Sequence, residues 1–271
     1  MADAASSMRA LRALPTLMRV GVSQAVAYRA EMLVWVLTTT MPLIMLPLWH
    51  AVAEEAPIRG FGQSRFTAYF LAAFVVRQVV GAWASWTINY EVRTGALSQR
   101  LLRPIHPLWT YATENLASIP MRAAIALPVG LTAFFLTGGA HLVRGAAMWA
   151  IVPLALLGAW CITFFAHVTI GALSLWMDQS IKVMDIWSAG FFVFSGYLVP
   201  IALFPDWLRA APEYMPFVYQ LGFPVDLLTG ALSEGEAWRR LGAQWLWVLG
   251  LGGLALLVWK RGLRRYGAFG G

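Results

Sequence analysis

The sequence predicts an all-α polytopic membrane protein with six transmembrane helices. Of its 271 residues, 59% are hydrophobic and only 12% are charged. A soluble domain carries roughly 25% charged residues, so this chain has too little polar surface to cover a globule in water. Its net charge of +7 is supplied almost wholly by arginines, which lie between long apolar runs. The charge therefore indicates membrane topology and argues against a nucleic-acid partner.

Six apolar segments are long enough to cross a bilayer, for which a helix needs roughly 20 residues. The fifth contains Gly190, Gly196 and Pro200, and we expect it to bend or break there. In chain order the expected spans are about Met32–Val52, Phe66–Ile88, Asn115–Thr137, Ala146–Met177, Val183–Phe204 and Leu241–Trp259.

Lysine and arginine are more frequent in cytoplasmic loops than in external ones, which sets the expected orientation. With six spans, both chain ends share one side with the second and fourth loops, and this side carries twelve Lys and Arg against six on the other. We therefore expect both termini in the cytoplasm. The chain divides into a cytoplasmic N-terminal segment (1–31), a six-span domain (32–260) and a cytoplasmic basic tail (261–271).

Three segments outside the spans have a recognisable character. Residues 8–30 carry arginines among leucines, which favours a helix lying on the cytoplasmic membrane surface, although a solvated basic tail stays open. In the second loop, Leu97, Leu101 and Leu102 recur at helical spacing and Pro104 ends the pattern, which predicts a short amphipathic helix parallel to the membrane. Such a helix either packs on lipid or docks a cytoplasmic partner. The proline-broken, apolar segment Pro205–Arg240 predicts short re-entrant or interfacial helices at the outer end.

The last two segments contain two longer patterns. They are Glu91-x-x-x-Gly95-x-Leu97-x-x-x-Leu101-Leu102-x-Pro104, and Gly196-Tyr-Leu-Val-Pro200-Ile-x-x-Phe204-Pro205-x-Trp207-Leu208 followed by Pro216 and Leu228-x-Gly230. Both patterns resemble those of the ABC-2 type permease family, the membrane subunits of many bacterial exporters. The agreement extends to span count, topology and the basic N-terminal helix.

The resemblance implies a permease that pairs with a second permease subunit, identical or different, in a bacterial plasma membrane. Two ATP-binding subunits, which carry ATP and Mg, would dock beneath the pair and push on a coupling helix. That helix would span residues 91–103. Its polar contacts to the ATPase would be Glu91, Arg93, Arg100 and Arg103, and its anchors to the bundle would be Leu97, Leu101 and Leu102, between Gly95 and Pro104.

The chain itself lacks the Gly-x-x-x-x-Gly-Lys-Ser or Gly-Lys-Thr loop that cradles nucleotide phosphates. We therefore expect it not to be an enzyme, and any ATP to be bound by another chain. No cofactor or metal is expected on the chain, because its single cysteine cannot build a cysteine metal cluster.

Arg77 lies near the middle of the second expected span, where an arginine costs about 2.5–3.5 kcal/mol. It either serves the transport pathway or subunit interface, for which Gly196 and Pro200 are further candidates, or forms an internal ion pair that fixes helix packing. His167 is isolated in an apolar span, which favours a buried, hydrogen-bonded histidine over a ligand.

Two other functions stay open from the sequence. One is a transporter driven by an ion gradient, although such proteins often place carboxylates at the membrane midplane and the deep spans here have almost none. The other is a non-transporting membrane assembly protein. The apolar composition favours an amphipathic or hydrophobic substrate for an exporter.

Overall fold

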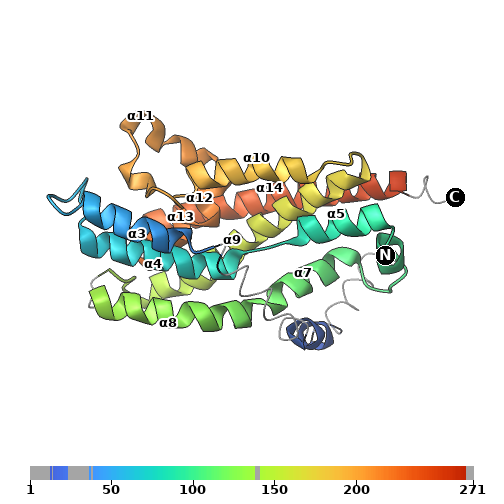
Figure 1. Cartoon of the computed structure of the whole chain (residues 1–271), viewed down its shortest axis with the longest axis horizontal. Coiled ribbons are helices and arrows are strands. Elements are labelled where there is room, and N and C mark those ends of the chain that lie inside the picture. The colour runs from blue at the N-terminus through green and yellow to red at the C-terminus, as the bar shows by residue number, and fades with distance from the viewer. Residues whose placement is uncertain (1–12, 14, 24–36, 38, 138–140, 267–271) are drawn as a thin grey trace.

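The computed structural model of the chain describes residues 13, 15–23, 37, 39–137 and 141–266. In this part of the chain the structure is helical, and the only strand-like pairing is an isolated bridge between Ile58 and Phe61. Figure 1 shows an elongated bundle in which the longer helices follow the long axis. The described residues therefore confirm the all-α prediction.

Three helical segments among the described residues are long and apolar enough to cross a membrane. They are Gln63–Thr94, Ala146–Leu175 and Glu234–Tyr266. These correspond to the second, fourth and sixth expected spans, and Met41–Val52 (α3) is a shorter apolar helix within the first. The rest of the first expected span lies mostly outside the described residues. A six-span topology with cytoplasmic termini stays a prediction.

The centre of the bundle is the pair α9 (Ala146–Ala172), which continues into η1 (Leu173–Leu175), and α14 (Glu234–Tyr266). Small residues let these helices approach closely, as is common between membrane helices. A Cβ at Gly252 would lie 3.1 Å from the Phe165 ring, and one at Gly158 would lie 2.6 Å from the amide oxygen of Gln244. The close packing of α14 on α9 therefore depends on glycine at these two positions.

The second expected span is not one continuous helix. It consists of α4 (Gln63–Val80) and α5 (Ala84–Thr94), separated by residues 81–83. The third expected span begins later than its apolar run suggested, because α7 (Pro107–Ala117) is a separate helix before α8 (Ile119–Thr137). Figure 1 shows the α4–α5 break near the middle of the long axis, with α8 running alongside α4.

The fifth expected span is shorter than predicted, since α10 (Ile181–Phe194) ends before residues 195–200. The expected break is confirmed at Gly196 and Pro200, whereas Gly190 stays inside the helix. Gly196 adopts φ 85°, a left-handed conformation, and its carbonyl accepts a 2.8 Å hydrogen bond from the Tyr69 hydroxyl. The break therefore fastens the end of α10 to α4.

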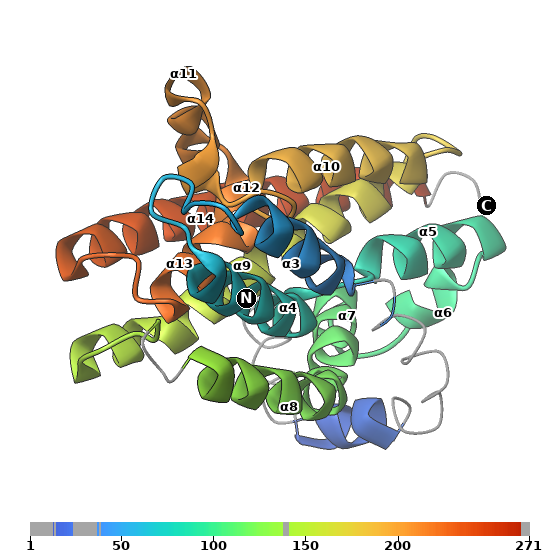
Figure 2. The same cartoon turned by 60° about the vertical axis from the view of Figure 1, so that its left-hand side comes forward.

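The segment after the break forms the short helices that the sequence predicted. They are η2 (Ile201–Leu203), α11 (Asp206–Arg209), η3 (Ala211–Tyr214), α12 (Pro216–Gln220) and α13 (Gly222–Leu228). Helices α12 and α13 are largely buried in the bundle, where Gln244 donates 2.9 Å hydrogen bonds to the carbonyls of Tyr219 and Ala155. By contrast, α11 projects from the bundle in Figure 2, and its Trp207 is 81% exposed.

The structure describes the two chain ends only in part. Helix α14 continues into the expected basic tail as far as Tyr266, while 267–271 lie outside the described residues, and the cytoplasmic tail stays a prediction. Near the N-terminus, residues 15–23 are helical, and a Cβ at Gly21 would lie 2.5 Å from that of Ala117 on α7. The remainder of segment 1–31 lies outside the described residues.

We expect Gly196→Ala to destabilise the protein. A side chain at φ 85° is strained and would collide with the Tyr69 hydroxyl, so the free energy of unfolding should fall by about 1–3 kcal/mol. A matched control is Gly253→Ala in α14, where a Cβ meets nothing within 4 Å. Thermal unfolding of both variants in detergent checks this, and equal midpoints would contradict it.

Candidate functional site

The turn after α5 is built around Gly95. Helix α5 ends at Thr94, Gly95 adopts φ 77°, and α6 (Leu97–Leu101) begins two residues later. A left-handed glycine commonly ends a helix in this way, because it has no Cβ to clash. The expected single helix over residues 91–103 is therefore wrong: Glu91 and Arg93 belong to the last turn of α5, and only 97–101 form the short helix.

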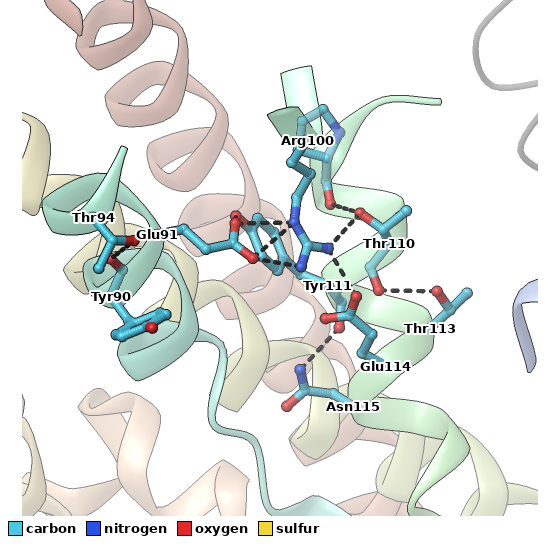
Figure 3. Close-up of polar contacts among 10 residues, drawn as sticks. Tyr90, Glu91, Thr94, Arg100, Thr110, Tyr111, Thr113, Glu114 and Asn115 are labelled. Carbon is cyan, nitrogen blue, oxygen red and sulfur yellow. Dashed lines mark hydrogen bonds and ion pairs between the residues drawn. The ribbon is translucent and has the colours of Figure 1, made fainter. Parts of the chain in front are cut away.

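Arg100 ties this turn to two other helices, as Figure 3 shows. Its Nε donates to both carboxylate oxygens of Glu91 at 2.9 and 3.0 Å. Its Nη1 donates to Thr110 Oγ1 at 3.0 Å and to Glu114 Oε1 at 2.8 Å, both on α7. Charge-assisted bonds of this kind are roughly twice as strong as neutral ones. One guanidinium thus connects α5, α6 and α7.

Tyr111 completes the cluster from α7. Its hydroxyl donates to Glu91, and its ring lies under the Arg100 guanidinium, 4.2 Å from Cζ to the ring centre. Burial raises the pKa of the Tyr111 phenol, and the hydrogen bond to Glu91 raises it further, so the phenol stays protonated as a donor. Burial lowers the pKa of Arg100, but the bond to Glu91 and the charge of Glu114 outweigh this and raise it.

Apolar contacts hold the same turn from the inside. Leu97 is fully buried in a cluster with Ile88, Tyr111 and Trp259, which come from α5, α7 and α14. The Ser98 hydroxyl lies 3.0 Å from the Tyr266 hydroxyl at the end of α14. Helix α6 is therefore fixed to three helices although it is only five residues long.

The opposite face of the turn is exposed in the described structure. Leu102 is 87% exposed, and the other exposed residues of the turn, apart from Ser98 beside Tyr266, are Arg93, Thr94, Gly95, Gln99, Leu101, Arg103 and Pro104. We call these residues, with Leu102, the outer face of the turn. Figure 1 shows that it lies at the end of the bundle where α14 also ends.

The expected roles within residues 91–104 need partial correction. Leu97 is an anchor, as predicted, but Leu101 and Leu102 are not, because both are exposed. Glu91 and Arg100 do not face outward as ATPase contacts, since both are largely enclosed and bound to each other. Helical spacing alone did not show that the chain turns at Gly95, and after that turn Arg100 points inward whereas Leu101 and Leu102 point outward.

Three residues of the cluster were missed from the sequence: Thr110, Tyr111 and Glu114. One signal was present. Glu114 is the only acidic residue between Glu91 and Asp178, and it lies one helical turn after Thr110. A carboxylate at the edge of a long apolar region needs a cationic partner, so it could have indicated a pairing with Arg100.

The remaining candidates lie elsewhere. The Arg77 guanidinium lies 5.0 Å from the ring centre of Phe191 and 6.0 Å from that of Tyr197, and none of the ion pairs between described residues includes it. Gly196 and Pro200 are buried in the break after α10. His167 is buried with Nδ1 3.0 Å from the Ser85 hydroxyl, which confirms the predicted hydrogen-bonded histidine.

Long apolar helices, short buried helices packed among them and a polar-anchored turn are typical of a multi-pass membrane protein. The family model described as ABC-2 family transporter protein matches residues 30–270. This covers most of the chain, which therefore belongs to that family, whose members are membrane subunits of ABC transporters and not their ATPases. A search of curated proteins gives no match.

We expect Arg100→Gln to loosen the turn and lower the free energy of unfolding by about 3 kcal/mol, because it leaves Glu91 and Glu114 enclosed without their cation. Hydrogen exchange of residues 95–104 and thermal unfolding measure this. Arg103→Gln, on the outer face of the turn, should change stability by no more than about 0.5 kcal/mol.

A double variant separates the pair from a general loss of packing. Glu91→Gln combined with Arg100→Gln should be more stable than the sum of the single changes predicts, because it removes the unpaired charge of Glu91. Strictly additive effects would show that the two groups do not interact as the structure indicates.

Proposed function

We propose that this chain is the permease subunit of an ABC exporter that moves an amphipathic or hydrophobic substrate with ATP hydrolysed by a separate subunit. The observation that supports this most directly is the two-sided character of the turn at α6. Its inner side is bound to three helices, and its outer face presents Leu102, Arg103 and Gln99 without a partner among the described residues.

The outer face has the composition of a docking surface. Leu102 is a large apolar side chain that is 87% exposed, and a groove on a partner would bury it. Arg93 and Arg103 flank it with positive charge, which favours an acidic groove on the partner. In this proposal the partner is the ATP-binding subunit.

The inner side provides the mechanical link. A displacement of α6 moves Arg100, which is bound to Glu91 on α5 and to Glu114 on α7. It also moves Ser98, which contacts the end of α14. A push from the ATPase would therefore reach three helices as one rigid unit, which is a rigid-body type of switch.

The complete transporter in this proposal contains two ATP-binding subunits, each with ATP and Mg, and a second permease subunit in a bacterial inner membrane. Ion-driven carriers need carboxylates or other ion ligands inside the membrane. Arg77, by contrast, places a cation within the second expected span.

The docking surface can be tested by copurification. We expect tagged wild-type chain, gently solubilised from its native membrane, to bring down an ATP-binding subunit. Leu102→Asp with Arg103→Glu should reduce the recovered ATPase at least about tenfold, because each removes a contact on the outer face. The control is Tyr214→Asp, which changes a large side chain of similar exposure at the opposite end of the bundle.

The outcomes distinguish an ABC permease from an ion-driven carrier. ATPase that is lost only from the outer-face variant supports the permease proposal and the docking site. ATPase that is retained by this variant rejects α6 as the docking element. If no ATPase accompanies the wild type under conditions that preserve other membrane complexes, an ion-driven carrier becomes the better explanation.

A further inference from the structure

The short helices near the start of α14, at the end of the bundle opposite the α6 turn, are attached to α14 at two places. Gln244 makes one attachment through neutral hydrogen bonds to the carbonyls of Tyr219 and Ala155. Arg240, one helical turn earlier on α14, makes the other through charged groups. The amide of Gln244 does not titrate, so only the attachment at Arg240 contains groups that a change of pH can alter.

Arg240 lies among three carboxylates that come from three elements. Its guanidinium is 3.2 Å from Asp226 of α13, 3.4 Å from Glu213 of η3 and 2.8 Å from Glu236 of α14. Arg239 is a second cation, 3.5 Å from Glu213, but its side chain is 59% exposed. We call these five residues the Arg240 cluster. When all of them are ionised, the cluster carries three negative charges and two positive ones.

Asp226 is the most enclosed carboxylate of the Arg240 cluster. Its side chain is 22% exposed, against 36% for Glu213 and 34% for Glu236. Among the described residues, its carboxylate accepts one hydrogen bond, from Nη1 of Arg240 at 3.2 Å. Enclosing an ionised carboxylate with so little compensation is unfavourable, whereas the protonated acid is neutral and tolerates enclosure.

Helix α4 presents two titratable groups to Asp226. The Arg65 guanidinium lies over the Phe61 ring, 4.1 Å from its centre, and attracts the carboxylate without forming an ion pair with it. The Tyr69 hydroxyl is turned to Gly196, to whose carbonyl it donates. Neither group therefore acts as a second direct partner of Asp226.

The other elements packed against α13 add no cation that pairs with Asp226. Helix α9 has no Asp, Glu, Lys or Arg, and α12 contributes Tyr219, whose hydroxyl donates to the Glu213 carbonyl at 2.8 Å. The loop before α9 carries His141 and Arg144, and no ion pair between described residues includes either of them. Arg240 is thus the direct partner on which the enclosed carboxylate depends.

The attachment of the short helices therefore depends on the proton of Asp226, which lies outside the expected spans. Burial raises the pKa of its carboxyl to about 6, although Arg240 and Arg65 lower it in part. When the short helices lift from α14, water reaches the carboxyl and its pKa returns towards the ordinary value. The attached state thus binds the proton more tightly, and it is favoured as the pH falls below about 6.

We propose that Asp226 is a proton-dependent latch, whose protonated form holds η3 and α13 against α14 and whose ionised form favours their release. That this latch closes the external end of a transport pathway, and slows release of substrate into an acidic exterior, rests on the proposed function. The movement itself requires no ATPase.

The test measures hydrogen exchange of residues 211–228 in the full chain in nanodiscs of phosphatidylcholine. Each rate is divided by that of an unfolded peptide at the same pH, which removes the intrinsic effect of pH on exchange. We expect opening of this segment to be about tenfold rarer at pH 5 than at pH 7.5, because pH 5 lies one unit below the pKa of the attached state. Residues 66–76 of α4 should not change and report on the fold as a whole.

Two substitutions assign the response to one carboxyl. Asp226→Asn keeps the shape of the side chain but cannot ionise, so the difference between pH 5 and pH 7.5 should disappear. The matched control is Asp206→Asn on α11, which removes a carboxylate that pairs with Arg59 and Arg209 outside the Arg240 cluster, and the tenfold difference should remain. Thermal unfolding shows whether each variant is folded, and the wild-type comparison is decisive if Asp226→Asn is not.

Three results would overturn or limit the inference. Equal opening of the wild type at both pH values overturns the latch without any variant. A tenfold difference that persists in Asp226→Asn belongs to another group and overturns it as well. Equal opening while the ATPase still copurifies rejects only this inference, whereas pH-dependent opening in a chain that brings down no ATPase rejects only the proposed function.

Discussion

The guanidinium of Arg100 is the interaction on which the organisation of the α6 end of the bundle depends. A five-residue helix cannot be stable alone, because forming its first turn costs more than its few hydrogen bonds return. Here Arg100 binds carboxylates from α5 and α7, and the buried Leu97 fixes the same turn to Trp259. Enclosing Glu91 is tolerable only because a cation and the Tyr111 hydroxyl satisfy it. The outer face of the turn can then remain free for a partner.

Two of the expected spans are interrupted, and side chains of α4 link the two interruptions. The second expected span is interrupted at residues 81–83 and the fifth at 195–200. Arg77 lies beside the first interruption, while its guanidinium lies over Phe191 and Tyr197 at the second. The Tyr69 hydroxyl bonds to Gly196 in the same region. Tyr69 and Arg77 of α4 therefore connect the two interruptions.

The composition was enough to predict a helical membrane protein, and most helices lie where apolar runs predicted them. The fourth span is within a few residues of α9 with η1, because an uninterrupted apolar run has one stable conformation in lipid. The break near Gly196 was also predictable from glycine and proline. The break at Gly81 was not, because the run around it stays apolar and local composition does not show that Arg122 from another helix bonds to its carbonyl.

The sequence by itself determined that this is a membrane protein, where its long helices approximately lie, and that a turn lies between Gly95 and Pro104. These follow from local properties: hydrophobicity, helix length and the special backbone conformations of glycine and proline. Only the tertiary structure decided which side of that turn faces inward, that Glu91 and Arg100 bind within the bundle, and that Arg122 of α8 bonds to the Gly81 carbonyl. Those outcomes depend on contacts between α4, α5, α7 and α8. The local sequence pattern of one helix does not show which residues of another helix it contacts.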